Sequence, residues 1–365
     1  MRTGFDNEKY QRIQSEHIKE RISRFDGKLY LELGGKLFDD HHASRVLPGF
    51  LPDSKLRMFQ KLSDSIEIVI VISATDIEKN KTRADLGITY DEDVLRLRGE
   101  FQHRGFMVGS VVITHYNGQP AAAAFRQRLE RDGIKTYCHY LIEGYPHNVA
   151  LIASDEGFGK NDYVETERPL VIVTAPGPGS GKMAVCLSQL YNEHRRGVRA
   201  GYAKFETFPV WNLPLKHPVN IAYEAATADL DDANIIDSFH LDAYGKTTVN
   251  YNRDVEAFPV VRALMQKILG ESPYQSPTDM GVNMVGFAIS DDDACREASR
   301  MEIVRRYFAA CEQVKRSGVG SEQVDRLRSI MQKAGIDSKA HTIAFSVPVA
   351  ATAGFKLFDA NEEEG

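Results

Sequence analysis

The sequence predicts an α/β protein, with a largely parallel sheet flanked by helices and followed by a mostly helical region. Through the first 209 residues, short apolar runs alternate with helical patterns, which is typical of βαβ units with right-handed crossovers. The run at 66–72, IEIVIVI, is almost continuously apolar, as expected for a strand that is covered on both faces. Beyond residue 209 the strand-like runs largely give way to helical patterns, so we expect a second, helical unit there.

The composition is that of a soluble globular protein. The chain has 365 residues, 42% of them hydrophobic and 26% charged, which suits about two domains. Its net charge of −6 argues against nucleic acid as the main partner. We expect no membrane span, because no run of 18 apolar residues occurs. A polar amino terminus and four cysteines without a C-x-x-C pair indicate a cytoplasmic protein with reduced thiols.

The elements of the first unit follow from local patterns. One apolar stripe at helical spacing predicts a helix from residue 7 to 25, and Asp26-Gly27 ends it before the next apolar run. Further helices are predicted at 54–62, 91–104, 119–132 and 182–196. Strands are predicted at 29–33, 66–72, 107–114, 135–142, 149–153, 170–174 and 200–206.

The second unit is predicted to consist mainly of helices. An aromatic, proline-containing connector begins it, and apolar residues at helical spacing follow. Helices are predicted at 219–236, 255–269, 290–317 and 321–333. After residue 341 we expect one strand and a disordered acidic end, so the predicted units are 1–209, 210–335 and 336–365.

The most informative motif is the loop that follows the 170–174 strand, APGPGSGK, which leads into a helical pattern. This order of strand, glycine loop and helix is that of a phosphate-binding loop, in which backbone N–H groups and a lysine meet an anion. The match is degenerate, since Pro176 replaces the first glycine and Met183 replaces the hydroxyl residue that would hold Mg²⁺. A plain strand-to-helix turn with an exposed lysine is the other interpretation. The predicted phosphate-binding residues are Gly177, Gly179, Ser180, Gly181 and Lys182.

A second glycine–lysine turn follows the 29–33 strand. Gly35 and Lys36 could contact a phosphate there, and a dense group of ionisable side chains comes next. Carboxyl ends of strands are where open α/β sheets place ligands. We therefore predict Asp39 and His41 as catalytic residues and Asp40 as a metal ligand. A solvated loop whose charges pair with one another explains the same pattern equally well.

The 66–72 strand is also followed by a carboxylate. Several apolar residues that end in Asp76 resemble a Walker B strand, so Asp76 is predicted to hold Mg²⁺ or to position a water molecule. Turns and helix caps favour the same residue types, and that interpretation stays open.

Longer blocks of the chain resemble a bacterial group, uncharacterised protein family 0371, over about residues 1–335. The blocks are GFDNEKY, FDGKLYLELGGKLFDDHHASRVLPGF, APGPGSGKMAVCLSQLY and KFETFPVWNLPLKHPVN. The resemblance implies a cytoplasmic protein with an α/β amino-terminal region, a helical middle and a further α/β subdomain, and no established biochemical function. That further subdomain would lie past residue 365, so we expect this chain to lack it. Some members carry the label of ATP-dependent peptidases, but the sequence has neither H-E-x-x-H nor G-x-S-x-G.

Two functions follow from these patterns. The first is an enzyme, a nucleotide- or phosphate-dependent transferase or hydrolase that uses ATP or another phosphorylated ligand together with Mg²⁺. The second is a non-catalytic module that binds an anion or nucleotide, with the helical unit driving assembly into a homo-oligomer. If the glycine loop is merely architectural, neither applies.

Overall fold

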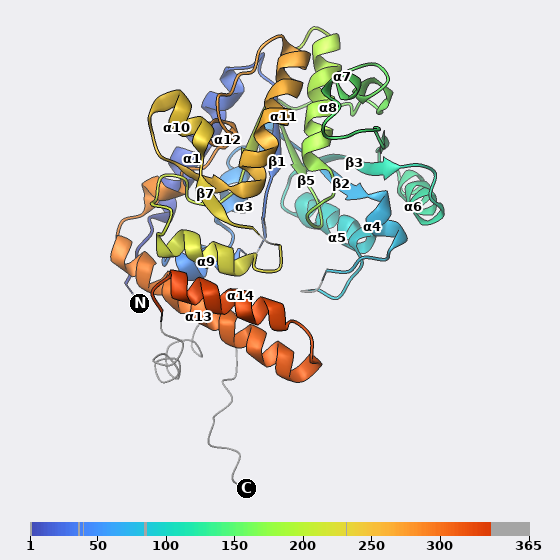
Figure 1. Cartoon of the computed structure of the whole chain (residues 1–365). Coiled ribbons are helices and arrows are strands. Elements are labelled where there is room, and N and C mark those ends of the chain that lie inside the picture. Colours follow the sequence, from blue (N-terminus) through green and yellow to red (C-terminus); the bar gives the residue numbers. More distant parts are fainter. Residues whose placement is uncertain (1, 36, 39, 84–85, 231, 337–365) are drawn as a thin grey trace.

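The computed structural model describes residues 2–35, 37–38, 40–83, 86–230 and 232–336 (Figure 1). Its centre is a parallel sheet of six strands in the order β4-β3-β2-β5-β1-β6. The strands are β1 (Leu29–Leu33), β2 (Ile66–Ser73), β3 (Met107–Tyr116), β4 (Thr136–Tyr140), β5 (Leu170–Thr174) and β6 (Gly201–Phe205). Every residue of β1, β2 and β5 is buried, as expected for strands covered by helices on both faces.

The direction of the chain connections reverses between two neighbouring strands of the sheet. β1 lies between β5 and β6, with Leu31 opposite Ile172 on one side and Ala203 on the other. The chain leaves β2 towards β3 and leaves the neighbouring β5 towards β6, in opposite directions across the sheet. In open α/β sheets, ligands bind outside the carboxyl ends of the strands at such a point.

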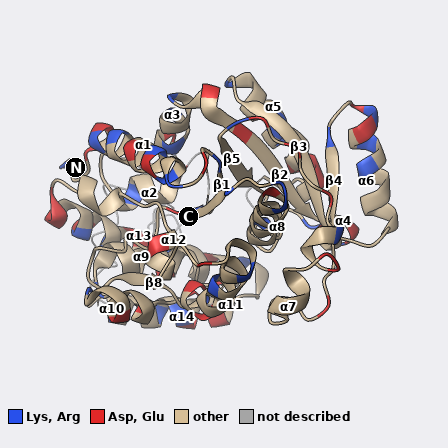
Figure 2. Ribbon diagram, turned by 90° about the horizontal axis from the view of Figure 1, so that it is seen from above, with Lys and Arg blue, Asp and Glu red and all other residues tan. Residues whose placement is uncertain are grey.

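Helices of the first part are positioned by local capping as well as by their apolar sides. Asp6 accepts a hydrogen bond from the Lys9 amide (2.9 Å) at the start of the first helix, and Thr89 and Glu92 form a capping box before the fifth. The outer helices α1 and α6 carry charges of both signs (Figure 2). The α-helices are α1 (Asn7–Ser23), α2 (His41–Val46), α3 (Ser54–Gln60), α4 (Ala74–Glu78), α5 (Tyr90–His103), α6 (Pro120–Arg131), α7 (Val149–Ile152) and α8 (Lys182–Arg195).

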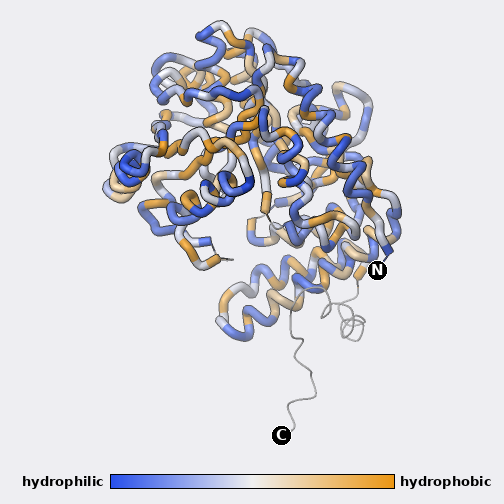
Figure 3. Tube along the Cα trace, turned by 180° about the vertical axis from the view of Figure 1, so that it is seen from behind, coloured by the Kyte–Doolittle hydropathy of each residue, from blue (hydrophilic) through white to orange (hydrophobic). Residues whose placement is uncertain are grey.

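The later part is mostly helical. A two-stranded antiparallel ribbon of β7 (Asn234–Ile236) and β8 (Val249–Tyr251) accompanies its helices. These are α9 (Pro218–Ala226), α10 (Ser238–Tyr244), α11 (Asn252–Leu269), α12 (Pro277–Met280), α13 (Asp292–Ser317) and α14 (Ser321–Lys333). The pair α13–α14, the lowest helices in the view of Figure 3, is banded blue and orange, as expected of helices with one apolar side. Short 3₁₀ segments are η1 (Ser63–Ser65), η2 (Phe158–Lys160) and η3 (Val285–Ala288).

Two hydrophobic clusters hold the protein together. The first surrounds the sheet and includes Phe258 and Val261 of α11. The second lies between α9, α13 and α14 and includes Tyr10 of α1 and Val46 of α2. α1 also contributes Ile18 to the first cluster. Segments far apart in the sequence therefore share both cores.

The predicted fold class is confirmed for the parallel sheet, its flanking helices and the mostly helical later part. Two predicted elements are wrong. Residues 149–152 form a helix rather than a strand, since Asn148 caps them by accepting from the Leu151 amide (3.2 Å), and short apolar runs fit either structure. α9 ends at Ala226, and Asn234 begins β7 instead of continuing the helix.

Some predictions lie beyond what the structure describes. The strand expected after residue 341 falls outside the described residues, and the unit boundaries at 209 and 335 stay predictions. Among the helices that are described, none is long and apolar enough to cross a membrane.

Candidate functional site

The predicted site residues follow three neighbouring strands at the same edge of the sheet. Gly35, Asp40 and His41 come after β1, Asp76 comes after β2, and the glycine loop comes after β5, which lies between β2 and β1. Parallel strands place their carboxyl ends together, so the fold brings these segments to one edge. The predicted Lys36 and Asp39 lie outside the described residues.

The loop between β5 and α8, residues 175–181, exposes backbone donors. Gly179 (φ 75°) and Gly181 (φ 88°) adopt the left-handed conformation that favours glycine, and Gly181 precedes the first turn of α8. Within the described part of the chain, the amides of Gly179, Gly181 and Lys182 donate to no acceptor. These are N–H groups of the kind that receive anions at the start of a helix.

Packing against β3 and α5 holds the β5–α8 loop in place. The Thr114 hydroxyl donates to the carbonyl oxygen of Ser180 (2.6 Å), and a Cβ on Gly181 would lie 3.2 Å from the Thr114 methyl group. A Cβ on Gly177 would collide with the Tyr90 hydroxyl. The Ser180 hydroxyl is buried and has no hydrogen-bond partner among the described residues.

Two cations near the β5–α8 loop differ in their surroundings. Lys182 is half-buried and forms no ion pair with any residue that the structure describes. Lys81, by contrast, lies 3.2 Å from Asp76 (Nζ to Oδ1) and 5.0 Å from the centre of the Tyr90 ring. Asp76 is thereby linked to the β5–α8 loop through Lys81 and Tyr90. The Lys182 ammonium, by contrast, is available to bind an anion.

His115, which follows Thr114 in β3, has a backbone conformation that residues other than glycine rarely adopt. Its φ is 52°, and such strain is concentrated at functional sites. Its Nδ1 lies 3.1 Å from the Ser73 hydroxyl oxygen. Burial lowers the pKa of His115, although Asp76 opposes this shift, so the ring is neutral at pH 7. His115 is not among the predicted site residues, although it stands at the end of a predicted strand.

A cavity of about 300 Å³ opens at the carboxyl ends of β1 and β6. We call it the β1–β6 cavity. The predicted Gly35, Asp40 and His41 line it. The other lining residues are Gly34, His42, Arg45, Lys55, Glu206, Thr207, Phe208, Tyr223, Ala226, Thr227 and Arg306.

Asp40, predicted as a metal ligand, is engaged by a lysine and by a helix. Its Oδ2 lies 2.7 Å from Lys55 Nζ, and its Oδ1 accepts the Ala43 amide (3.1 Å) at the start of α2. Burial works to raise the pKa of Asp40, but Lys55, the Ala43 amide and His42 together hold it below its ordinary value. Among the described residues, no group of three or more His, Cys, Asp and Glu side chains could hold a metal ion.

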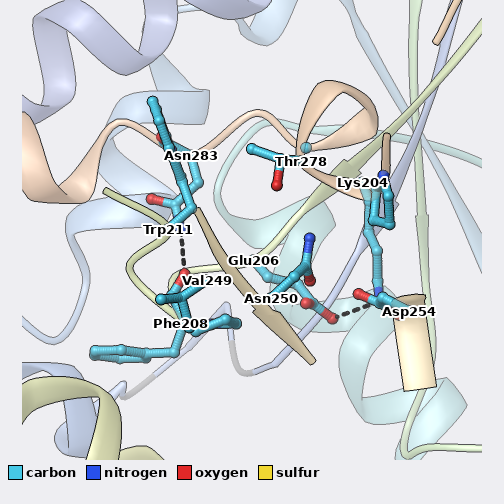
Figure 4. A pocket seen from close by; sticks show the side chains of 12 residues that line it. Lys204, Glu206, Phe208, Trp211, Val249, Asn250, Asp254, Thr278 and Asn283 are labelled. Carbon is cyan, nitrogen blue, oxygen red and sulfur yellow. Dashed lines mark hydrogen bonds and ion pairs between the residues drawn. The ribbon is translucent and has the colours of Figure 1, made fainter. Parts of the chain in front are cut away.

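Charged residues outside the predicted set lie beside this cavity. Lys204 of β6 contacts Glu206 (3.1 Å) and Asp254 of α11 (2.6 Å) in a smaller adjoining cavity of about 40 Å³ (Figure 4). Burial raises the pKa of Glu206 well above its usual range, Lys204 opposes the shift, and Asp254 and Glu32 add to it. The sequence signal that could have identified this cluster is a charged residue inside an otherwise apolar strand. Glu32 in β1 and Lys204 in β6 are both such residues.

Comparison with known proteins places the chain in a family. Residues 3–335 match the family described as "Domain of unknown function DUF1846, N-terminal". The chain belongs to this family.

Related proteins agree with this assignment. A UPF0371 protein of Corynebacterium diphtheriae is 62% identical over 341 residues, which are 93% of this chain and 69% of the relative. A UPF0371 protein of Streptococcus thermophilus is 59% identical over 333 residues, 91% of this chain and 67% of the relative. The resemblance to uncharacterised protein family 0371 is thus confirmed, and none of these names states an activity.

In this DUF1846 family member, the carboxyl edge offers two distinct chemistries. The β5–α8 loop presents backbone N–H groups and the Lys182 ammonium, which suit an anion. The β1–β6 cavity combines guanidinium groups, imidazoles and two carboxyl groups in a concave space, which is the usual form of a small-molecule site.

Proposed function

We propose that this protein binds a phosphorylated small molecule, of which ATP is one candidate, at the β5–α8 loop. The observation that carries the proposal is the set of donors without acceptors: the amides of Gly179, Gly181 and Lys182 among the described residues. Phosphate oxygens accept from such amides, and the start of α8 adds a partial positive charge. The half-buried Lys182 side chain would neutralise part of the phosphate charge.

The finer proposal is that the bound phosphoryl group is transferred or hydrolysed. Mg²⁺ is usually held by one or two carboxylates together with ligand phosphates, and Asp76 is the carboxylate nearest in the chain to the end of β2. Asp76 pairs with Lys81, so the lysine would have to yield to the metal ion. His41 would serve as the acid–base group. Without this chemistry, the same loop makes the protein a binding module.

A thermal-shift screen tests binding. The probes are ATP, other nucleotides and sugar phosphates, each with and without Mg²⁺. A ligand that binds only the folded protein raises its stability by about 2.7 kcal/mol at a hundred times the dissociation constant. We expect at least one probe to raise the melting temperature of the wild type.

Variants then locate the binding. Lys182→Ala should remove the shift, because the ammonium is lost from the loop. Lys135→Ala is the matched control: Lys135 is exposed and precedes β4, at the opposite edge of the sheet, so the shift should be unchanged. The proposal is overturned if no probe stabilises the wild type, or if Lys182→Ala keeps the full shift.

A second pair of variants separates enzyme from binding module. With the probe that binds, Asp76→Asn or His41→Ala should leave binding largely intact and abolish release or transfer of phosphate if the protein is an enzyme. Absence of turnover in the wild type with bound probe and Mg²⁺ would leave only the binding module.

A further inference from the structure

In the wall of the β1–β6 cavity that α2 and α13 form, cationic side chains outnumber carboxylates. Glu302 of α13 is only 2% exposed, and its carboxylate lies 2.8 Å from Arg45 Nε, 2.6 Å from Arg305 Nε and 2.8 Å from Arg306 Nε. Burial works to raise the pKa of Glu302, but hydrogen bonds with Arg305 and His42 hold it well below its usual range. One carboxylate thus serves three guanidinium groups, of which Arg45 and Arg306 line the cavity.

One buried nitrogen atom in this wall, His42 Nε2, has no hydrogen-bond partner in the described structure. Arg45 Nε, by contrast, is paired with the Glu302 carboxylate at 2.8 Å. An unsatisfied buried polar group costs about 1–3 kcal/mol. An orphaned group of this kind beside a cavity calls for a ligand that completes it.

The position of His42 defines what such a ligand must offer. The imidazole packs edge-on against Phe208 and Tyr223, with ring centroids 5.1 and 5.5 Å away. Its Nδ1 lies 3.3 Å from Arg306 Nη2 and 3.5 Å from Glu302 Oε1. Nδ1 therefore either accepts a hydrogen bond from Arg306 or donates one to Glu302. If Nδ1 accepts, Nε2 is a hydrogen-bond donor, and if Nδ1 donates, Nε2 is an acceptor. A hydroxyl group suits both.

Glu206, directly after β6, supplies a further hydrogen-bonding group. Its side chain crosses Gly34, where a Cβ would lie 2.8 Å from the Glu206 carboxyl carbon. Phe208 and Tyr223 stack on each other, with ring centroids 5.0 Å apart, and form the apolar part of the lining. The lining therefore combines cations, a carboxyl group and an apolar surface.

From this arrangement we infer that the β1–β6 cavity binds a small hydroxylated organic molecule bearing an oxyanion, which Arg45 and Arg306 hold beside His42. The oxyanion is a carboxylate or a phosphate, since guanidinium groups accept both. No residue of the β5–α8 loop lines the cavity, so this inference does not depend on anion binding at that loop.

Isothermal titration calorimetry of the full chain tests the inference, with gluconate, glucose 6-phosphate and inorganic phosphate as probes. Gluconate and glucose 6-phosphate share a hydroxylated body and differ in the oxyanion, so their relative affinities identify it. We expect at least one of the two to bind saturably and more tightly than inorganic phosphate. If neither binds the wild type saturably, the inference fails.

Arg306→Gln and Arg305→Gln form a matched pair. Both remove a guanidinium group from Glu302, but only Arg306 lines the cavity. Loss of a buried charged partner typically weakens binding by more than about tenfold, so we expect that loss for Arg306→Gln and less than about threefold for Arg305→Gln. Equal weakening by the two variants would overturn the site.

Two further variants keep the test decisive. If Arg306→Gln does not fold, Arg45→Gln replaces it, since the Arg45 side chain is 35% exposed and tolerates the change. Lys182→Ala should leave binding at the cavity unchanged. If Lys182→Ala abolishes the titration while Arg306→Gln preserves it, the probe occupies the β5–α8 loop, and the inference about the cavity is wrong.

Discussion

At the scale of single residues, Glu302 holds the charge balance of the β1–β6 cavity. Replacing it by glutamine leaves Arg45, Arg305 and Arg306 without their carboxylate. Removing one partner of a buried ion pair costs about 3–5 kcal/mol. We therefore expect Glu302→Gln to lower the free energy of unfolding by that order, measured by urea denaturation at pH 7. Glu312→Gln is the control, because Glu312 lies on the same helix in an exposed pair with Arg316.

The effect of Glu302→Gln should depend on pH. The pKa of Glu302 is depressed in the folded protein, whereas in the unfolded chain it is about 4.3. The stability that its charge contributes is therefore present above about pH 4.3 and is lost as the pH falls towards the folded pKa. The difference in the free energy of unfolding between the wild type and Glu302→Gln should become smaller from pH 6 to pH 3. A gap that stays constant over this range would show that ionised Glu302 does not contribute in this way.

Residues after strand ends could be predicted from the sequence, but their distant partners could not. Asp40 and His41 follow an apolar run, and the rule that ligands gather at strand ends is enough to select them. Glu302 and Arg306 lie on α13, more than 250 residues later, in a pattern that fits any exposed helix. Only the packing of α13 against α2 brings them beside His42.

At the scale of elements, two glycines should respond in opposite ways to alanine. Gly34, in the turn after β1, is covered by the Glu206 side chain, and forcing a methyl group into packed space costs about 1–3 kcal/mol. Gly99 lies on the exposed side of α5 with nothing within 4 Å of its Cβ position, so Gly99→Ala should stabilise by about 0.5–1 kcal/mol. Thermal and urea unfolding measure both. A neutral Gly34→Ala would mean that Glu206 moves aside without cost.

Elements with long, regular patterns were predictable, and short ones were not. The β2 run and the helical stripe of α5 each carry enough residues to show their period. The four apolar residues at 149–152 are too few to show a period, and the cap from Asn148 favours a helix. β7 exists because it pairs with β8, Asn234 opposite Tyr251, a contact that no local pattern encodes.

At the scale of the whole molecule, the sheet order comes from contacts between distant segments. The position of β5 between β2 and β1 depends on pairs such as Ile172 with Leu31 and Ile68. Alternating strands and helices predict a parallel sheet but leave the order open, because each strand could pair with several others. The switch point between β2 and β5 thus became visible only in the structure.

The interwoven cores predict that the protein unfolds as one unit. α1 contributes Ile18 to the sheet cluster and Tyr10 to the helical cluster, and its Gln14 side chain donates to the Val282 carbonyl (2.8 Å). Loss of either cluster therefore removes support from the other. Trp211, the single tryptophan, donates to the Asn283 carbonyl (2.6 Å) and reports on the later part of the chain, whereas far-UV circular dichroism reports on all elements. We expect both signals to change with one urea midpoint, and two separated midpoints would show instead that the clusters unfold independently.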